Sequence, residues 1–306
     1  MKRLASSVCM VIIITCIPRQ TTAQPDFSDD LYYSNNVTYE IGGSIGVMNC
    51  LTDLGGRKGI GKKFIKDINL GKTQPSGSVF VSAVYKNALV LRSEATWGIV
   101  TASDAVLKSV KESTFGRYER NLSFRSTIFE VALITEIHSR YFRKYADGEK
   151  LPRFSPYALG GIGYFRFNPQ AKLDSEWIDL QRLSTEGQGF VEYPHKKIYK
   201  LKQINFPVGA GFKYKLSPLF NFSAEFVYRI LNTDYLDDVS TTYIDPITFS
   251  NPLNNYSVID LARVLKLYDR QSEINPSHIT NVGDTRGNPK NKDAYFSINL
   301  KVGFIF

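Results

Sequence analysis

The chain has 306 residues and a formal net charge of +9, and its 18 tyrosines and 20 phenylalanines favour strands and membrane interfaces. Beyond residue 23, no uninterrupted apolar stretch is long enough for a membrane-spanning helix. A membrane protein with this sequence must therefore cross the bilayer as a closed barrel of strands, because only helices and closed barrels satisfy every backbone group in lipid.

The first 23 residues have the order of a secretory signal peptide. Lys2 and Arg3 precede an apolar run over residues 4–17, and small residues lead to an expected cleavage after Ala23. The run is shorter than the about 20 apolar residues of a membrane anchor. Cleavage leaves a single domain over residues 24–306, whose charge is near +6 because three of the basic residues lie in the signal.

Cysteine usage restricts the chemistry of the exported chain. Cys9 and Cys16 lie in the signal, so only Cys50 remains, and neither an internal disulfide nor a cysteine metal cage is expected. A lipoprotein modified at Cys16 is an alternative, although the preceding Ile13-Ile14-Thr15 matches the lipobox poorly. We expect no cofactor and no metal.

The basic charge suggests contact with acidic surfaces. For an exported protein the expected partner is the outer-membrane lipid, in particular lipopolysaccharide phosphates, and no nucleic acid is expected. The simpler interpretation is a mild excess of lysine on solvated loops, since the basic residues form no single dense cluster.

The alternation of side chains over residues 295–306 is the strongest signal in the sequence. Successive side chains of a strand point to opposite faces. One face of this segment is wholly apolar, and the other is mostly polar or small. The segment ends the chain on Phe306, which resembles the C-terminal signal for insertion of bacterial outer-membrane barrels. The apolar face is Phe296, Ile298, Leu300, Val302, Phe304 and Phe306.

Seven further segments repeat this alternation, each near the about 9–11 residues that a tilted membrane strand needs. Tyr157, Leu159, Phe165 and Phe167 line one side of the fifth strand, which is rich in glycine. The pattern predicts an all-β protein, an eight-stranded antiparallel transmembrane β-barrel of the outer-membrane type with long extracellular loops. The seven segments are 39–47, 79–85, 89–97, 129–137, 157–167, 204–214 and 220–230.

Two classes of connection alternate along the chain. Outer-membrane barrels have short periplasmic turns and long external loops. The lengths therefore predict that the long loops face outside and that both termini are periplasmic. The spacing within 258–268 also favours a short helix in the last loop. The shorter connections are 86–88, 144–153 and 216–218, and the long ones are 50–76, 100–121, 168–201 and 232–293.

The polar faces of the strands carry nine charged residues. Eight strands enclose an interior just wide enough for side chains to fill it, and an unpaired buried charge costs several kcal/mol. We therefore expect an internal ion-pair network that plugs the lumen; the alternative is a conduction path for small ions or solutes. The nine residues are Glu40, Arg92, Glu94, Glu130, Glu136, Lys213, Glu225, Arg229 and Lys301.

No catalytic residue is predicted. His138 precedes Ser139 at the end of the fourth strand, and such a pair favours a lipid hydrolase, but no partner acid is evident from spacing, so an interfacial residue is expected. Asp234, Asp237 and Asp238 offer oxygen ligands for calcium, but their spacing does not match an EF-hand loop, and a turn or solvated cluster is expected.

Five segments are distinctive when taken together, namely 120–126, 157–163, 185–189, 234–240 and 286–296. This set resembles the PorG-like family of small outer-membrane barrels from Bacteroidota. The resemblance implies a part of the type IX secretion system, associated with a periplasmic ring of PorK-like lipoprotein and PorN-like partner. It gives no contact residues, and the predicted orientation leaves the connection 144–153 and the segment 24–36 as periplasmic surfaces.

Three functions follow from these observations. The first is a non-enzymatic barrel that serves protein secretion. The second is a general OmpA-like or OmpW-like barrel for surface adhesion or passage of small solutes. The third, which the sequence supports least, is a barrel enzyme acting on lipid.

Overall fold

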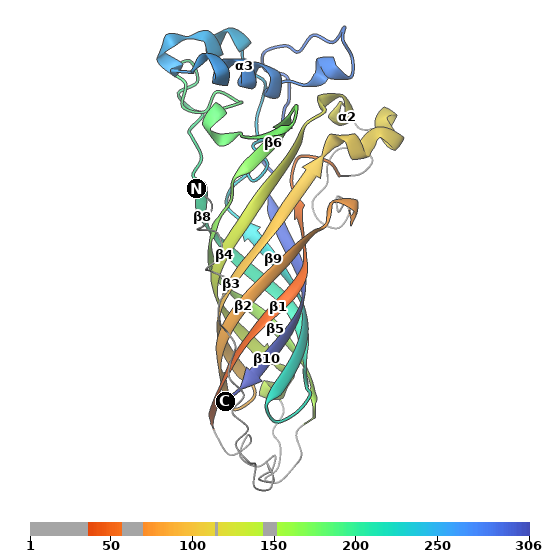
Figure 1. The fold of residues 1–306 in the computed structure, drawn as a ribbon, viewed down its shortest axis with the longest axis vertical. Helices are drawn as coiled ribbons and strands as arrows, with labels where there is room; N and C mark the ends of the chain where they lie inside the picture. The colour runs from red at the N-terminus through yellow and green to blue at the C-terminus, as the bar shows by residue number, and fades with distance from the viewer. Residues whose placement is uncertain (1–35, 57–69, 114–115, 143–151) are drawn as a thin grey trace, which may run out of the picture.

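Eight strands close into an antiparallel barrel in the computed structural model, which describes residues 36–56, 70–113, 116–142 and 152–306. Their order is β3-β2-β1-β10-β9-β8-β5-β4, and pairing of β3 with β4 closes the ring (Figure 1). This confirms the predicted fold class. The barrel strands are β1 (Val37–Leu51), β2 (Gln74–Tyr85), β3 (Leu89–Ser103), β4 (Ser123–His138), β5 (Phe154–Arg166), β8 (Lys202–Lys215), β9 (Phe220–Leu231) and β10 (Ala294–Ile305).

The alternation seen in the sequence sets the two faces of the wall. In β4, burial alternates strictly from Ser126 to His138, with Glu130 and Glu136 buried and the intervening Val131 and Leu133 about half exposed. Similar outward side chains ring the barrel as an apolar belt, which a soluble barrel would not leave open to water. The belt includes Ile41, Ile45, Val79, Val81, Leu91, Trp97, Phe129, Val131, Leu133, Ile162, Tyr164, Ile204, Phe226, Ile298, Leu300 and Val302.

Strand β5 shows that an apolar side is not always the outer side. Tyr157, Leu159 and Phe165 point into the barrel, together with Phe167 just beyond the strand, while Ile162 and Tyr164 face outward. Both faces of β5 are apolar or small, so alternation alone does not distinguish them. The inward aromatic residues Phe165 and Phe167 join the core that fills the loop end of the lumen.

The two ends of the barrel differ as the connection lengths predicted. At one end Lys86 and Asn87 have φ values of 49° and 52°, the conformation of the tight turns that join hairpin strands. β1 begins and β10 ends at this short-turn end, where the Phe306 N–H donates to the Tyr39 carbonyl at 3.0 Å. The long connections gather at the opposite, loop end (Figure 1).

The loop end has secondary structure and a core of its own. Strands β6 (Pro169–Leu173) and β7 (Glu176–Asp179) form a hairpin that extends the sheet beyond β4, and the sequence did not predict it. Helix α3 (Val258–Leu267) confirms the predicted short helix, and the Ser257 hydroxyl caps it by accepting the Asp260 N–H. Within the described residues, no helix has the length and apolarity to cross a membrane. The other helical segments are η2 (Leu70–Lys72), η3 (Asp104–Ser113), α2 (Arg117–Arg120), η4 (Ser139–Phe142), η5 (Gln181–Leu183), η6 (Pro246–Ser250), η7 (Pro252–Asn254) and η8 (Gln271–Glu273).

Two apolar clusters stack at this end. The lower one fills the mouth of the lumen, where Leu236 and Val239 of the last loop pack with strand residues such as Met48, Val100 and Phe165. The upper one joins the β6–β7 hairpin to α3 through Ile178, Phe249 and Val264 among others. The start of the last loop therefore folds back over the barrel and closes its mouth.

Candidate functional site

Arg92 on β3 is the centre of the charge network in the lumen. Its Nε lies 2.9 Å from Glu94 Oε2 and its Nη2 3.1 Å from Glu225 Oε2, while Nη1 contacts Glu136. All four side chains are almost wholly buried. β3 and β9 are not neighbours in the sheet, so the contact between Arg92 and Glu225 crosses the lumen.

Two lysines extend the network. Lys301 Nζ lies 2.6 Å from Glu94 and 2.7 Å from Glu225, so one ammonium joins two carboxylates. Lys213 Nζ lies 3.0 Å from Glu40 and 3.8 Å from Glu136. Seven of the nine predicted residues thus form one connected cluster of four carboxylates and three cations.

Glu130 and Arg229 form a separate pair. Arg229 Nε lies 3.3 Å from Glu130 Oε2. The same carboxylate accepts hydrogen bonds from the Asn205 amide at 2.7 Å and from the Tyr295 hydroxyl. The structure therefore places the nine residues in two groups, with neutral donors completing the smaller one.

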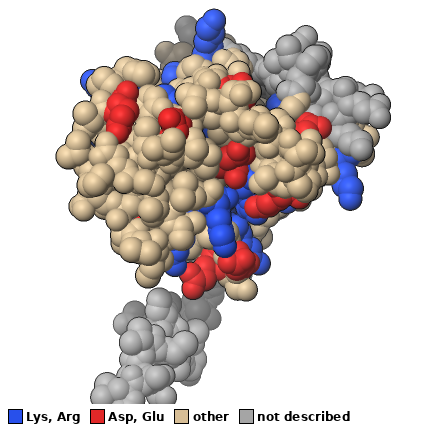
Figure 2. All heavy atoms as spheres, turned by 90° about the horizontal axis from the view of Figure 1, so that it is seen from above, with Lys and Arg blue, Asp and Glu red and all other residues tan. Residues whose placement is uncertain are grey.

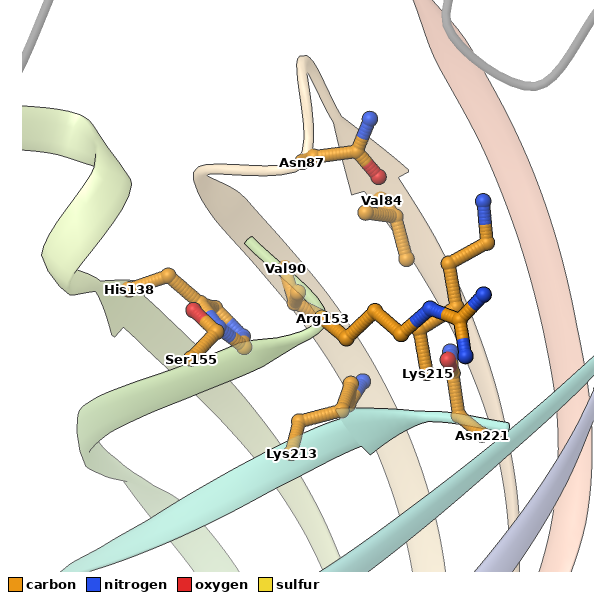
Figure 3. Close-up of a pocket in the computed structure, with 9 residues that line it drawn as sticks. All are labelled: Val84, Asn87, Val90, His138, Arg153, Ser155, Lys213, Lys215 and Asn221. Atoms are coloured by element: carbon orange, nitrogen blue, oxygen red, sulfur yellow. The ribbon is translucent and has the colours of Figure 1, made fainter. Parts of the chain in front are cut away.

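At the short-turn end, Ser155, His138 and Glu136 form a row of interacting side chains beside a small pocket. This arrangement was not predicted from the sequence. The Ser155 hydroxyl lies 3.0 Å from His138 Nδ1, and Glu136 Oε2 lies 3.1 Å from His138 Nε2; His138 and Ser155 are seen side by side in Figure 3. His138 is 3 % exposed, so the expected interfacial position is wrong. The acid partner stands two residues before the histidine, and residues i and i+2 of a strand share a face, so this spacing was available in the sequence.

The geometry of this pocket fits a structural role better than catalysis. In hydrolytic triads the hydroxyl faces Nε2 and the acid holds Nδ1; here the two are exchanged. Glu136 is also engaged by Arg92. The cavity measures about 30 Å³, room for only one or two waters. Figure 3 shows Arg153, Lys213 and Lys215 around the same pocket.

The aspartates of the last loop lie in a turn, one of the two expected arrangements, where the Asp238 N–H donates to the Tyr235 carbonyl at 3.3 Å. They are buried, so the other expectation, a solvated cluster, is wrong. Asp234, Asp237 and Asp238 are each at most 3 % exposed. Burial raises the pKa of Asp234 to about 7 and that of Asp238 to about 6. Most of their oxygens accept hydrogen bonds: Asp237 from the Leu54 and Val239 N–H groups, Asp238 from the hydroxyls of Thr185 and Tyr199. No three acidic, histidine or cysteine residues in the described ranges are grouped to hold a metal.

Segments far apart in the chain converge in this loop core. The Glu186 carboxylate accepts from the Ser240 and Thr241 N–H groups at 2.9 and 3.0 Å and pairs with Arg286 Nη1 at 3.0 Å. Arg286 also donates to the Asp238 carbonyl at 2.7 Å. Four of the five segments that carry the family resemblance, those around Arg120, Glu186, Asp238 and Arg286, therefore meet in one buried polar core.

The remaining predicted features lie at the chain ends. Phe306 is 69 % exposed at the short-turn end and stacks on Tyr39 with ring centroids 6.1 Å apart. The predicted signal peptide, Cys16 and most of the segment 24–36 lie outside the described residues, as do residues 144–151.

Comparisons with known proteins add little beyond this geometry. No family model and no curated protein matches the chain. Solved structures that are similar include Ail of Yersinia pestis in complex with sucrose octasulfate (10% identity, 88% of this chain and 97% of that one, TM-score 0.34). Neisserial surface protein A has 9% identity, coverage of 88% and 99%, and a TM-score of 0.35. A major outer membrane protein of Thermus thermophilus has 11% identity, coverage of 89% and 100%, and a TM-score of 0.38. With scores this low, the fold assignment rests on the closed strand pairing.

Proposed function

We propose that this chain is an outer-membrane barrel that serves as a non-enzymatic component of a type IX protein secretion machine. The observation that carries the proposal is the filled lumen. Buried ion pairs occupy its middle, and the apolar core with the last loop closes its loop end. A barrel without an open path works through its two ends and its wall, as an anchor does.

The membrane location is supported by the outer belt of the barrel. Outward side chains such as Ile45 (73 % exposed) have no protein to cover them, and lipid is the environment in which such a belt is stable. The difference between the two ends supports an orientation with the long loops outside and both termini in the periplasm, where lipopolysaccharide is the lipid around the loops.

The partnership is supported by the resemblance and by the charge of the short-turn end. Lys86 and Arg153 are exposed there, and Lys215 lines the pocket beside Arg153. A basic end suits an acidic surface on a periplasmic ring of PorK-like lipoprotein and PorN-like partner. Most of the predicted contact segments 144–153 and 24–36 lies outside the described residues.

Affinity purification of the tagged protein from its native membranes tests the proposal. We expect the ring lipoprotein and its partner to copurify with the wild type, and Lys86→Glu/Arg153→Glu to weaken their recovery by about tenfold, because charge complementarity governs such contacts. Arg263→Glu/Lys266→Glu, on α3 at the loop end, is the matched control and should behave as the wild type. Absence of both ring proteins from the wild-type sample would contradict the secretion role.

The organised loop end favours a second candidate, a general OmpA-like or OmpW-like barrel for adhesion or small-solute passage. Its hydrophobic core and helix make a rigid surface that a plain anchor does not need. Adhesion of cells that display the barrel, lost when the loops are shortened, would favour this function. Steady conductance in planar bilayers would favour solute passage and would contradict a plugged lumen.

The contact of Ser155, His138 and Glu136 is the observation in favour of a lipid-acting enzyme. Hydrolysis of membrane lipid by the purified barrel, lost in His138→Ala, would establish that function. We expect no hydrolysis above background, because the pocket has no room for an ester substrate.

A further inference from the structure

A large cavity lies against the outer wall of the barrel at the loop end. Its volume is about 950 Å³, at the upper end of the range for small-molecule sites. Leu51, Ala294 and Ile230 line it and stand directly opposite one another across β1, β10 and β9. Residues paired in this way share one face of a sheet, and Ile230, at 46 % exposed, shows that this face is the outer one.

The floor of the cavity thus continues the apolar belt. Ala294 is only 3 % exposed although it is on the outer face, and residues of the last loop line the same cavity. Tyr228 lines the same floor and stands two residues before Ile230 on β9, on the same face of the strand. An acyl chain lying along the barrel wall can therefore enter the cavity without leaving an apolar surface.

The loop residues that line the cavity are largely polar, and basic residues outnumber acidic ones among them. Lys290 and Lys292 of the last loop line the cavity, and within the described ranges neither ammonium has an ion pair. The acids on the same walls already accept backbone hydrogen bonds: Asp53 from the Asn288 N–H, Asp293 from the Leu236 N–H and Asp284 from the Asn281 N–H. Arg120 and Arg286 also line the cavity but are paired with Asp104 and Glu186. The two lysines are thus the ammonium groups that can meet a ligand.

A buried hydroxyl without a hydrogen-bond partner is a second indication that the cavity holds a ligand. Tyr243 lines the cavity, is 3 % exposed, and its hydroxyl has no hydrogen-bond partner in the described structure. A buried hydroxyl is normally satisfied. Figure 2, which views the loop end, shows basic and acidic side chains gathered in a furrow between largely uncharged lobes.

We propose that this cavity binds a phosphate-bearing lipid of the leaflet on the loop side, with its acyl chain on the floor formed by Leu51, Ile230 and Ala294 and its phosphate at Lys290 and Lys292. This inference rests on the proposed outer-membrane location and orientation, which make bisphosphorylated lipid A the lipid present there. Phosphate oxygens are strong acceptors for ammonium donors, and the apolar floor selects an amphiphile over a soluble anion.

Native mass spectrometry of the full chain in detergent tests the site with three probes: bisphosphorylated lipid A, its dephosphorylated form and inorganic phosphate. We expect a one-to-one adduct with lipid A that persists at collision energies that remove dephosphorylated lipid A. Lys290→Glu/Lys292→Glu should weaken the adduct at least about tenfold, since a hydrogen bond to a charged group accounts for about that factor. The α3 variant Arg263→Glu/Lys266→Glu should retain it.

Equal retention of both lipid forms, or an unchanged adduct in Lys290→Glu/Lys292→Glu, would overturn the proposal. Inorganic phosphate competing as well as lipid A would also overturn it, since the site would then be a soluble anion site. A gel-mobility assay for the folded barrel confirms that each variant is intact. Copurification of the ring proteins with Lys290→Glu/Lys292→Glu separates this inference from the secretion role, because a failed lipid site leaves that recovery unchanged.

Discussion

Replacement of Arg92 by methionine is the sharpest test of the lumen network. The guanidinium contacts Glu94, Glu136 and Glu225, and methionine keeps the aliphatic volume but removes the charge. Lys301 still reaches Glu94 and Glu225, and Lys213 still lies near Glu136. Four carboxylates then face two cations in a water-poor lumen.

The expected loss in the free energy of unfolding is about 3–5 kcal/mol, the usual cost of removing one partner of a buried ion pair. Urea titration of the detergent-solubilised barrel, followed by tryptophan fluorescence and by the gel-mobility shift of the folded form, measures it. Arg263→Met is the matched control. Its pairs with Glu176 and Asp260 are partly exposed, and exposed pairs contribute about 0–1 kcal/mol.

A second variant separates charge from packing. Arg92→Met/Glu225→Gln removes one of the carboxylates that are in excess over the remaining cations, so its loss should be smaller than the sum of the two single losses by about 1 kcal/mol or more. Strict additivity, or an Arg92→Met loss within about 1 kcal/mol of the Arg263→Met loss, would refute the reasoning. Either result would mean that water reaches the lumen carboxylates and screens their charges.

Two further predictions address packing and the loop core. A Cβ at Gly303 would collide with the Glu40 carboxylate, so Gly303→Ala should cost about 1–3 kcal/mol in the same urea titration, whereas Gly160→Ala, where a Cβ meets nothing within 4 Å, should be near neutral. Burial raises the pKa of Asp238 from 3.8 to about 6, so the folded loop binds a proton more tightly than the unfolded loop does. This contribution is fully present below the unfolded pKa and is lost as pH rises through about 6. A shift of about 2 units corresponds to about 3 kcal/mol, so limited proteolysis of the loops should be slower at about pH 5 than at about pH 8, and Asp238→Asn should reduce the difference; an unchanged difference in that variant would contradict the assignment.

The inward and outward faces of the barrel strands could be predicted, because they depend only on the alternation of neighbouring residues. A period of two assigns each side chain to a face, so the inward positions of residues such as Glu130, Glu136 and Arg92 followed without knowledge of the rest of the chain. Alternation does not distinguish the two faces of a strand where both are apolar, as in β5, whose Tyr157 and Phe165 turn inward. The contact of His138 with Glu136 was not predicted, although the two residues are two positions apart on one face of β4.

The geometry within the lumen was not predictable in the same way. Arg92 meets Glu225 across 133 residues of sequence, and Lys213 meets Glu40 across 173. These contacts cross the barrel between strands that are not neighbours, so they depend on the tilt and stagger of the whole wall. Alternation gives the set of inward charges but not their division into a cluster of seven and a pair.

The buried polar core of the loops was even harder to predict from the sequence, because its carboxylates have a different kind of hydrogen-bond partner. In the lumen, acids meet cations. In the loop core, Glu186 has Arg286, but Asp237 and Asp293 depend mainly on backbone N–H groups that only the folded loops present. A sequence shows which side chains carry charge and says nothing of where a loop directs its amides. The aspartates were therefore expected in a turn or a solvated cluster, and their burial was not predicted. The same dependence couples the first and the last connection: Asp237 accepts from the Leu54 N–H, and Asp53 accepts from the Asn288 N–H. Displacing either connection would therefore leave a buried or half-buried carboxylate of the other without its partner.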